Sequence, residues 1–155
     1  MTGAEFADWI SKYIVTNFGD RGLSVYREVS VGKSIIGKNR RVDILVVDNI
    51  NNKAIAFECK YQAVTGTVDE KVPYTINDAE SMQMDSYIVY GGTGFSKGVI
   101  HMLEASELAC HAEPDMDHLD SYKRTKDTKE LDQILAMRLH WWDVFTEKAK
   151  EVIVE

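Results

Sequence analysis

The sequence predicts a single α/β domain in which a mixed β-sheet is flanked by helices, and three observations lead to this fold class. The chain has 155 residues, near the usual size of one domain, and no linker rich in Gly, Ser or Pro divides it. Hydrophobic residues make up 45% of the chain, enough for one core. Helical and strand-like patterns alternate, with three consecutive strands and a fourth that returns through a helix. A meander followed by such a crossover gives a mixed sheet.

The first half of the chain predicts one helix and three strands. Apolar residues recur at helical spacing over residues 3–17, and Thr2 with Glu5 forms a capping-box pattern at the start of this helix. The following segments are rich in alternating or β-branched residues and are separated by turn formers. The predicted strands cover residues 23–31, 41–47 and 54–60, and the turns between them cover residues 32–39 and 48–53.

The second half predicts a strand between helices. Pro73 disturbs the start of the first of these helices, and Ser96 is a suitable N-cap for the second. Leu131, Leu135 and Trp142 belong to the apolar face of a long last helix. The predicted elements are a helix from residue 69 or 74 to 83, a strand over 86–90, a helix over 97–108, an irregular segment over 110–126 and a C-terminal helix over 128–152.

Composition excludes several classes of protein. The chain carries 18 Lys and Arg against 25 Asp and Glu, a formal net charge of −7, which argues against binding to nucleic acid through bulk charge but allows a local basic groove. No apolar stretch approaches the ~20 residues of a membrane span. The two cysteines, Cys59 and Cys110, are too few for a disulfide framework. We therefore expect a cytoplasmic protein with no membrane partner.

Charged side chains in residues 41–62 mark the candidate site. Asp43 stands in an otherwise apolar strand, where carboxylates are uncommon. Glu58 and Lys60 end the next strand and, being two residues apart, project from the same face, with Cys59 opposite. If the turn at 48–53 joins these strands as a hairpin, Asp43 lies beside Glu58. Two carboxylates and a lysine then converge at one end of the sheet.

This combination of side chains suits the hydrolysis of a phosphodiester. A carboxylate pair becomes favourable when a hard divalent cation lies between its members, and Mg²⁺ usually takes one or two protein carboxylates. A lysine beside the metal can orient or deprotonate water, or neutralise charge that develops on the phosphate. The alternative is that Asp43 only ends a strand, that Glu58 and Lys60 form a solvated pair, and that the domain is a small binding protein. The apolar neighbours of Asp43 and Glu58 favour a site.

The arrangement resembles the PD-(D/E)xK nuclease superfamily, whose restriction-endonuclease-like fold has an αβββαβ core. Asp43 followed by Glu58-Cys59-Lys60 carries the resemblance over residues 2–90, although Val42 stands where the motif name has Pro. Residues 60–74 are also similar to a run in restriction-type and phage-type nucleases. The resemblance implies an endonuclease that acts on DNA with Mg²⁺, or Mn²⁺ in its place. Asp43 and Glu58 would be metal ligands, and Lys60 the general base or water-orienting residue.

Further candidates surround this motif. Gln62 follows Lys60 by two residues, and some members of the superfamily carry Gln there. Glu5 resembles a first-helix Glu that many members direct at the metal site, and the capping box with Thr2 explains it equally well. We include Gln62 and Glu5 among the expected catalytic residues. Glu70 would lie near the site, although a charged first helical turn is the simpler explanation of this residue.

Local basic residues would contact DNA phosphates despite the net negative charge. Most of them lie on the predicted first hairpin, and others lie near helix starts. The expected DNA-facing residues are Lys33, Lys38, Arg40, Arg41, Lys71 and Lys97, with the run 123–126 as a further candidate. The glycine-rich residues 91–97 lack the spacing of a phosphate-binding loop and predict a tight turn.

Two questions remain open at the level of the sequence. The long, Trp-rich last helix is the expected interface of a homodimer or higher oligomer, which would present two sites to two strands. The alternative function is a non-catalytic nuclease-fold subunit of a DNA-processing complex, but such a subunit would be expected to lack Asp43, Glu58 or Lys60. The resemblance places the protein in the cytoplasm of a bacterium or a phage-infected cell.

Overall fold

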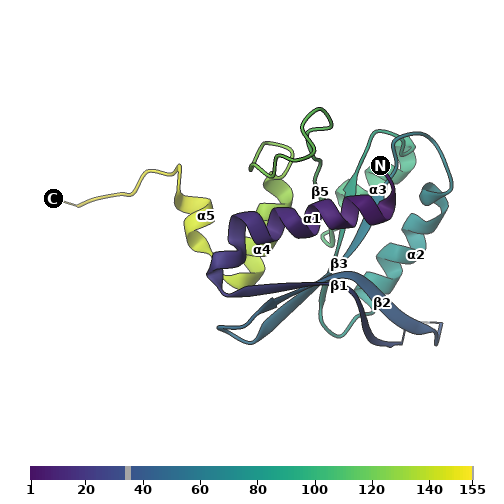
Figure 1. Cartoon of the computed structure of the whole chain (residues 1–155), viewed down its shortest axis with the longest axis horizontal. Coiled ribbons are helices and arrows are strands. Elements are labelled where there is room, and N and C mark those ends of the chain that lie inside the picture. The colour runs from purple at the N-terminus through teal and green to yellow at the C-terminus, as the bar shows by residue number, and fades with distance from the viewer. Residues whose placement is uncertain (34–35, 155) are drawn as a thin grey trace.

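The structure is a computed structural model that describes residues 1–33 and 36–154. Its helices and strands follow the predicted order and form a sheet with helices packed around it (Figure 1). The elements are α1 (Gly3–Phe18), the 3₁₀ helix η1 (Gly19–Arg21), β1 (Leu23–Lys33), β2 (Asn39–Asp48), β3 (Lys53–Tyr61), α2 (Val68–Glu80), β4 (Asp85–Gly91), α3 (Lys97–Ala105), β5 (Ala109–His111), α4 (Lys129–Leu139) and α5 (Trp142–Thr146).

The sheet is mixed, as predicted. Its strands lie in the order β1-β2-β3-β4-β5, with antiparallel pairing from β1 to β3 and parallel pairing from β3 to β5. The Asp48 carboxylate stabilises the turn between β2 and β3, because it accepts hydrogen bonds from the backbone N–H groups of Ile50 and Asn51. Strand β5 was not predicted, since its three residues are too few to show a periodic pattern.

The two faces of the sheet pack against different helices. Phe57 and Cys59 of β3 join the larger core, which α1, α4 and α5 cover. Ile88 and Tyr90 of β4 belong to a smaller cluster with α2 and α3 on the other face. Residues of β3 alternate between the faces, so Glu58 lies on the side of α2 and α3.

Strand β2 parts from β3 halfway along its length. Pairing between β2 and β3 ends at Ile44 opposite Phe57, whereas β1 and β2 remain paired out to Lys33 and Asn39. At the same level β1 contains Glu28 in the left-handed region, with φ 54°, which bends the strand. Residues 28–33 and 39–43, here called the outer hairpin, therefore leave β3 and extend below α2 (Figure 1). We call the point of separation, at Asp43, the fork.

The predicted helix over 128–152 is wrong in its extent. Helix α4 ends at Leu139, and His140 adopts a left-handed conformation with φ 63° before the short α5 begins. This break changes the helical phase, so Trp141 is buried while Trp142 is 54% exposed. Residues 150–154 have no regular secondary structure.

The other boundaries differ less from the prediction. The capping box of α1 is confirmed, because the Thr2 hydroxyl accepts from the Glu5 N–H and Glu5 accepts from the Thr2 N–H. Helix α2 begins at Val68 and keeps Pro73 inside, and α3 ends earlier than predicted because β5 follows. The predicted turn over 32–39 falls partly outside the described residues, and β1 continues to Lys33. None of the described helices has the length and apolar character needed to cross a membrane.

Candidate active site at the fork of the sheet

Asp43 is fixed to the neighbouring strand at the fork. Its Oδ2 accepts a hydrogen bond of 2.8 Å from the backbone N–H of Cys59. Where the ladder between β2 and β3 has stopped, the carboxylate thus replaces a backbone carbonyl as the acceptor for β3. Asp43 is half-buried, so one carboxylate is held in place at the separation of the two strands.

Glu58 and Lys60 lie on the same face of β3 and come close to Asp43. In the register of the sheet Glu58 pairs with Ile88 and Lys60 with Tyr90, while Cys59 is buried on the opposite face. The Glu58 side chain is hydrogen-bonded to that of Asp43 and lies within electrostatic range of Lys60. The structure therefore places Glu58 next to both Asp43 and Lys60.

The environment of Glu58 disfavours its charged form. Burial is the largest cause, and the negative charge of Asp43 adds to it, so that the pKa of Glu58 rises to about 8. Lys60 opposes this rise, whereas a hydrogen bond with Asp43 and the charge of Asp78 on α2 reinforce it. Without a further cation near the pair, the Glu58 carboxyl therefore keeps its proton at neutral pH.

The residues at the fork fit a hard divalent cation. Two carboxylates that repel each other in a buried setting are stabilised by a positive ion between them, and Mg²⁺ binds proteins through one or two carboxylates with water in its remaining positions. Within residues 1–33 and 36–154 no group of three or more His, Cys, Asp or Glu side chains is arranged to hold a metal. The pair Asp43 and Glu58 is thus the set of ligands that the fork offers.

Comparison with known families identifies the fold. The profile described as PD-(D/E)XK nuclease superfamily domain matches residues 2–142, which is most of the chain and includes the whole fork. The chain belongs to the PD-(D/E)XK nuclease superfamily. Membership agrees with the mixed sheet, the flanking helices and the Asp43, Glu58 and Lys60 motif. No curated protein matches the chain significantly.

The chain is similar in part to three solved structures, each with a TM-score below 0.5. A protein of unknown function, AF1548, is 14% identical with a TM-score of 0.42, over 63% of this chain and 53% of its own. A repair endonuclease from Pyrococcus abyssi is 17% identical with a TM-score of 0.39, over 66% and 44%. An EndoMS–dsDNA2 complex is 15% identical with a TM-score of 0.39, over 70% and 44%. The PD-(D/E)XK chain thus aligns with about half the length of each.

Gln62 lies beyond the end of β3 and joins two loops of the domain. Its side chain is buried, and its Nε2 donates to Asp69 Oδ1 at 3.0 Å and to the backbone oxygen of Gly94 at 2.8 Å. Asp69 in turn accepts from the backbone N–H of Ser96, at the start of α3. A side chain at Gly94 would collide with the backbone of Val64, so the loops touch directly. Gln62 therefore links the starts of α2 and α3 beside Lys60.

Glu5 lies at the exposed N-terminus of α1, where it completes the capping box. The structural explanation of this residue is confirmed. Its expected second role, toward the metal site, remains a prediction, since none of its hydrogen bonds involves Asp43 or Glu58.

Most of the predicted DNA-facing cations are exposed. They extend from the outer hairpin to the starts of α2 and α3, and Ser96 caps the helix that begins at Lys97. The exposed members are Lys33, Lys38, Arg41, Lys71 and Lys97. Arg40 differs, because its side chain is only 9% exposed and forms an ion pair of 2.6 Å with Asp78. In this conformation Arg40 is bound to the protein and is not open to a phosphate.

Two acidic residues near the site were not singled out from the sequence. Asp69 and Asp78 both lie on α2, on either side of a buried stripe that includes Val72, Thr75 and Ala79. Helical spacing from these buried residues places Asp78 at the edge of the buried face of α2, and this spacing was the sequence pattern that could have identified Asp78. His111, the last residue of β5, pairs with Glu113, and His118 pairs with Asp115 in the segment that follows.

Proposed function

We propose that this PD-(D/E)XK domain is a Mg²⁺-dependent endonuclease that hydrolyses phosphodiester bonds of DNA. The observation that carries the proposal is the meeting of Asp43, Glu58 and Lys60 at the fork. A half-buried carboxylate pair accompanied by one lysine is poorly explained by folding, because this setting raises the pKa of Glu58 to about 8. It is well explained by a bound cation and an anionic substrate.

Asp43 and Glu58 would hold the metal ion. The backbone N–H of Cys59 binds Oδ2 of Asp43, and Oδ1 would serve as the ligand to the metal. When bound, a divalent metal polarises a phosphoryl oxygen and lowers the pKa of a coordinated water. We expect Mn²⁺ to substitute for Mg²⁺, because both accept oxygen ligands.

Lys60 would act on the water or on the phosphate. Lys60 projects from the same face of β3 as Glu58, is half-buried as a residue, and lies close enough for its charge to act on that carboxylate. From there it can orient or deprotonate the attacking water, or stabilise charge that develops on the phosphate.

DNA would approach the fork along the exposed cations of the domain. Lys33 and Arg41 lie on the outer hairpin and Lys38 lies just before β2, while Lys71 and Lys97 lie at the starts of α2 and α3. These two groups flank the face of the sheet that carries Glu58 and Lys60. Contacts from both sides would fix a phosphate backbone over the site despite the net charge of −7.

Cleavage of supercoiled and linear DNA tests this function. Reactions with Mg²⁺, Mn²⁺ and EDTA are compared for the wild type, Glu58→Gln and the exposed control Glu107→Gln. We expect nicking with either metal by the wild type and the control, and none with EDTA or with Glu58→Gln. DNA binding without any cleavage by the wild type would refute the enzyme and favour a non-catalytic nuclease-fold subunit.

We further propose that two copies of the domain associate through α4 and α5. Trp142 is 54% and Met137 51% exposed, and the Trp142 ring stacks on His140 with an interplanar angle of 7°. Association of two copies would cover these exposed apolar side chains. Such a dimer would present two sites to the two DNA strands.

A further inference from the structure

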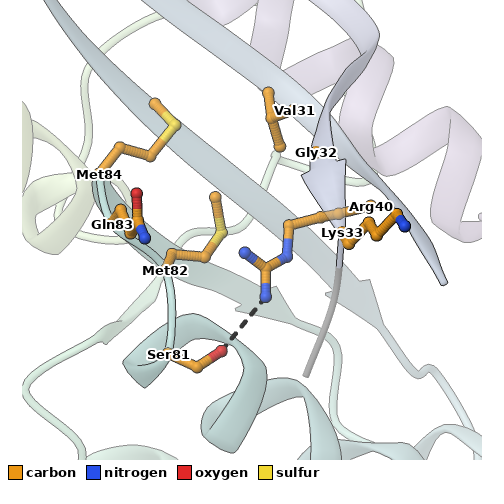
Figure 2. Close-up of a pocket in the computed structure, with 8 residues that line it drawn as sticks. All are labelled: Val31, Gly32, Lys33, Arg40, Ser81, Met82, Gln83 and Met84. Carbon is orange, nitrogen blue, oxygen red and sulfur yellow. Dashed lines mark hydrogen bonds between the residues drawn. The ribbon is translucent and has the colours of Figure 1, made fainter. Parts of the chain in front are cut away.

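An ion pair joins the outer hairpin to the end of α2. Arg40 Nη2 lies 2.6 Å from Asp78 Oδ1 and 3.2 Å from the hydroxyl of Ser81. Figure 2 shows the guanidinium directed toward Ser81, while the Lys33 ammonium points away from it. The side chains of Arg40 and Asp78 are only 9% and 16% exposed. Charged groups this buried are held by their partner, and separating them is unfavourable.

This ion pair is the polar anchor of the outer hairpin. Beyond the fork, β2 has lost its ladder with β3, so β3 no longer fixes its position. Among the described residues, Arg40 makes the only side-chain hydrogen bonds from the outer hairpin to α2 and to the residue after it, Ser81. The position of the hairpin relative to α2 therefore depends on Arg40.

The same ion pair lies close to the metal site. Arg40 precedes Asp43 by three residues on one strand, so a displacement of the outer hairpin moves Asp43. Asp78 is near enough to Glu58 for its charge to affect that carboxylate. Arg40 neutralises Asp78, which would otherwise add a third uncompensated negative charge beside Asp43 and Glu58.

We propose that Arg40 is a positioning residue for the metal site, and that through Asp78 it holds the outer hairpin where Asp43 and Glu58 share one divalent cation. The proposal replaces the expected role of Arg40 in contacting DNA. It rests on the proposed function for the identity of the cation. Arg40 itself touches neither metal nor substrate.

Four variants and one matched control separate positioning from DNA contact. Arg40→Gln and Asp78→Asn each break the ion pair, and the double variant removes both charges so that the net charge stays at −7 and no buried charge is left alone. Arg40→Lys keeps the positive charge for Asp78. Arg41→Gln is the matched control, because Arg41 is the exposed neighbour on the same strand. Urea unfolding shows that each variant is folded before it is used.

The first measurement is Mn²⁺ affinity by titration calorimetry without DNA. We expect the double variant to bind Mn²⁺ about tenfold more weakly than the wild type, the size of effect that residues supporting metal ligands have. Arg40→Lys should recover most of the affinity, and Arg41→Gln should bind Mn²⁺ like the wild type. Because the double variant keeps the net charge, bulk electrostatics cannot produce this loss.

The second measurement is DNA affinity in EDTA as a function of salt. Arg40→Gln should retain the wild-type slope, whereas Arg41→Gln should lose about one unit for the phosphate contact removed. A flattened slope for Arg40→Gln with unchanged Mn²⁺ affinity would overturn the proposal in favour of DNA contact. Wild-type Mn²⁺ affinity in the folded double variant would overturn it as well.

Failure of the proposed function gives a different result. A wild type that binds Mn²⁺ but cleaves no DNA would refute the nuclease while the affinities of the variants still decide the role of Arg40. A wild type that binds no divalent cation would refute both proposals together.

Discussion

Replacing Glu58 by Gln should stabilise the metal-free protein at neutral and alkaline pH. Glutamine keeps the size of the side chain and can donate a hydrogen bond to Asp43, as the protonated Glu58 does, but it carries no charge to bury. Burial and the neighbouring Asp43 raise the pKa of Glu58 from 4.5 to about 8 in the folded protein. The folded protein therefore retains a proton that the unfolded chain releases.

The sign and size of the effect follow from that difference. A folded-state pKa above the unfolded value makes the free energy of unfolding fall as pH rises from about 4.5 to about 8, after which it is constant. At 1.36 kcal/mol per unit, the loss reaches about 5 kcal/mol above pH 8 and about 3 kcal/mol at pH 7. Glu58→Gln has no such ionisable group, so its free energy of unfolding should exceed that of the wild type by these amounts.

Urea unfolding in EDTA at pH 5, 6, 7 and 8 measures the difference. Trp9 and Trp141 are buried, so their fluorescence reports the loss of the core. The unfolding free energies of wild type and Glu58→Gln should be similar at pH 5 and diverge steadily toward pH 8. The exposed control Glu107→Gln should follow the wild type throughout. Parallel pH profiles for wild type and Glu58→Gln would refute the assignment of a buried, repelled carboxylate at this position.

Three further outcomes test the site. Asp43→Asn should lower cleavage by orders of magnitude, measured on gels, but keep or raise DNA affinity in EDTA, measured by fluorescence anisotropy. The amide oxygen can still accept a hydrogen bond from Cys59, and one negative charge facing the phosphates is gone. Joint loss of folding and DNA binding would show that the Asp43 carboxylate is structural. Lys60→Arg retains a positive charge but cannot serve as a base near neutral pH, so single-turnover rates should fall steeply if Lys60 moves a proton, and near-normal rates would leave only electrostatic stabilisation. Trp142→Ser should shift sedimentation toward the monomer at micromolar concentration without lowering stability, and an unchanged distribution would exclude this surface as the interface.

The central motif was predictable because it depends on short-range geometry. The turn after Asp48 fixes the register between β2 and β3, and the two-residue period of a strand then puts Asp43, Glu58 and Lys60 on one face. The capping box at Thr2 and the cap at Ser96 are local in the same way and were also predicted. Features of this kind need no knowledge of distant contacts.

The features that the sequence did not reveal depend on unusual backbone conformations and on tertiary contacts. Glu28 and His140 adopt left-handed conformations that favour glycine, so nothing in the sequence indicated the bend in β1 or the end of α4. Arg40 is directed toward Asp78 instead of solvent, although neither residue differs in type from its exposed neighbours. The pairing of a hairpin residue with a helix residue 38 positions away is fixed only by the packed fold.

The stability of Glu58 variants also distinguishes a nuclease from a non-catalytic domain of the same fold. In a non-catalytic domain that binds no metal, Glu58 destabilises the fold at neutral pH, and Glu58→Gln is the more stable protein with or without Mg²⁺. In a metal-dependent nuclease a cation that binds only the folded wild type adds about 1.4 kcal/mol at ten times its dissociation constant, and more at higher concentration. Glu58→Gln lacks the ligand charge and does not gain this stabilisation. Rising Mg²⁺ concentration should therefore narrow the difference in unfolding free energy between the two proteins and finally make the wild type the more stable one. A residue that destabilises the empty fold and stabilises the metal-bound one is explained by its ligand, as expected where function and folding make opposite demands on one side chain.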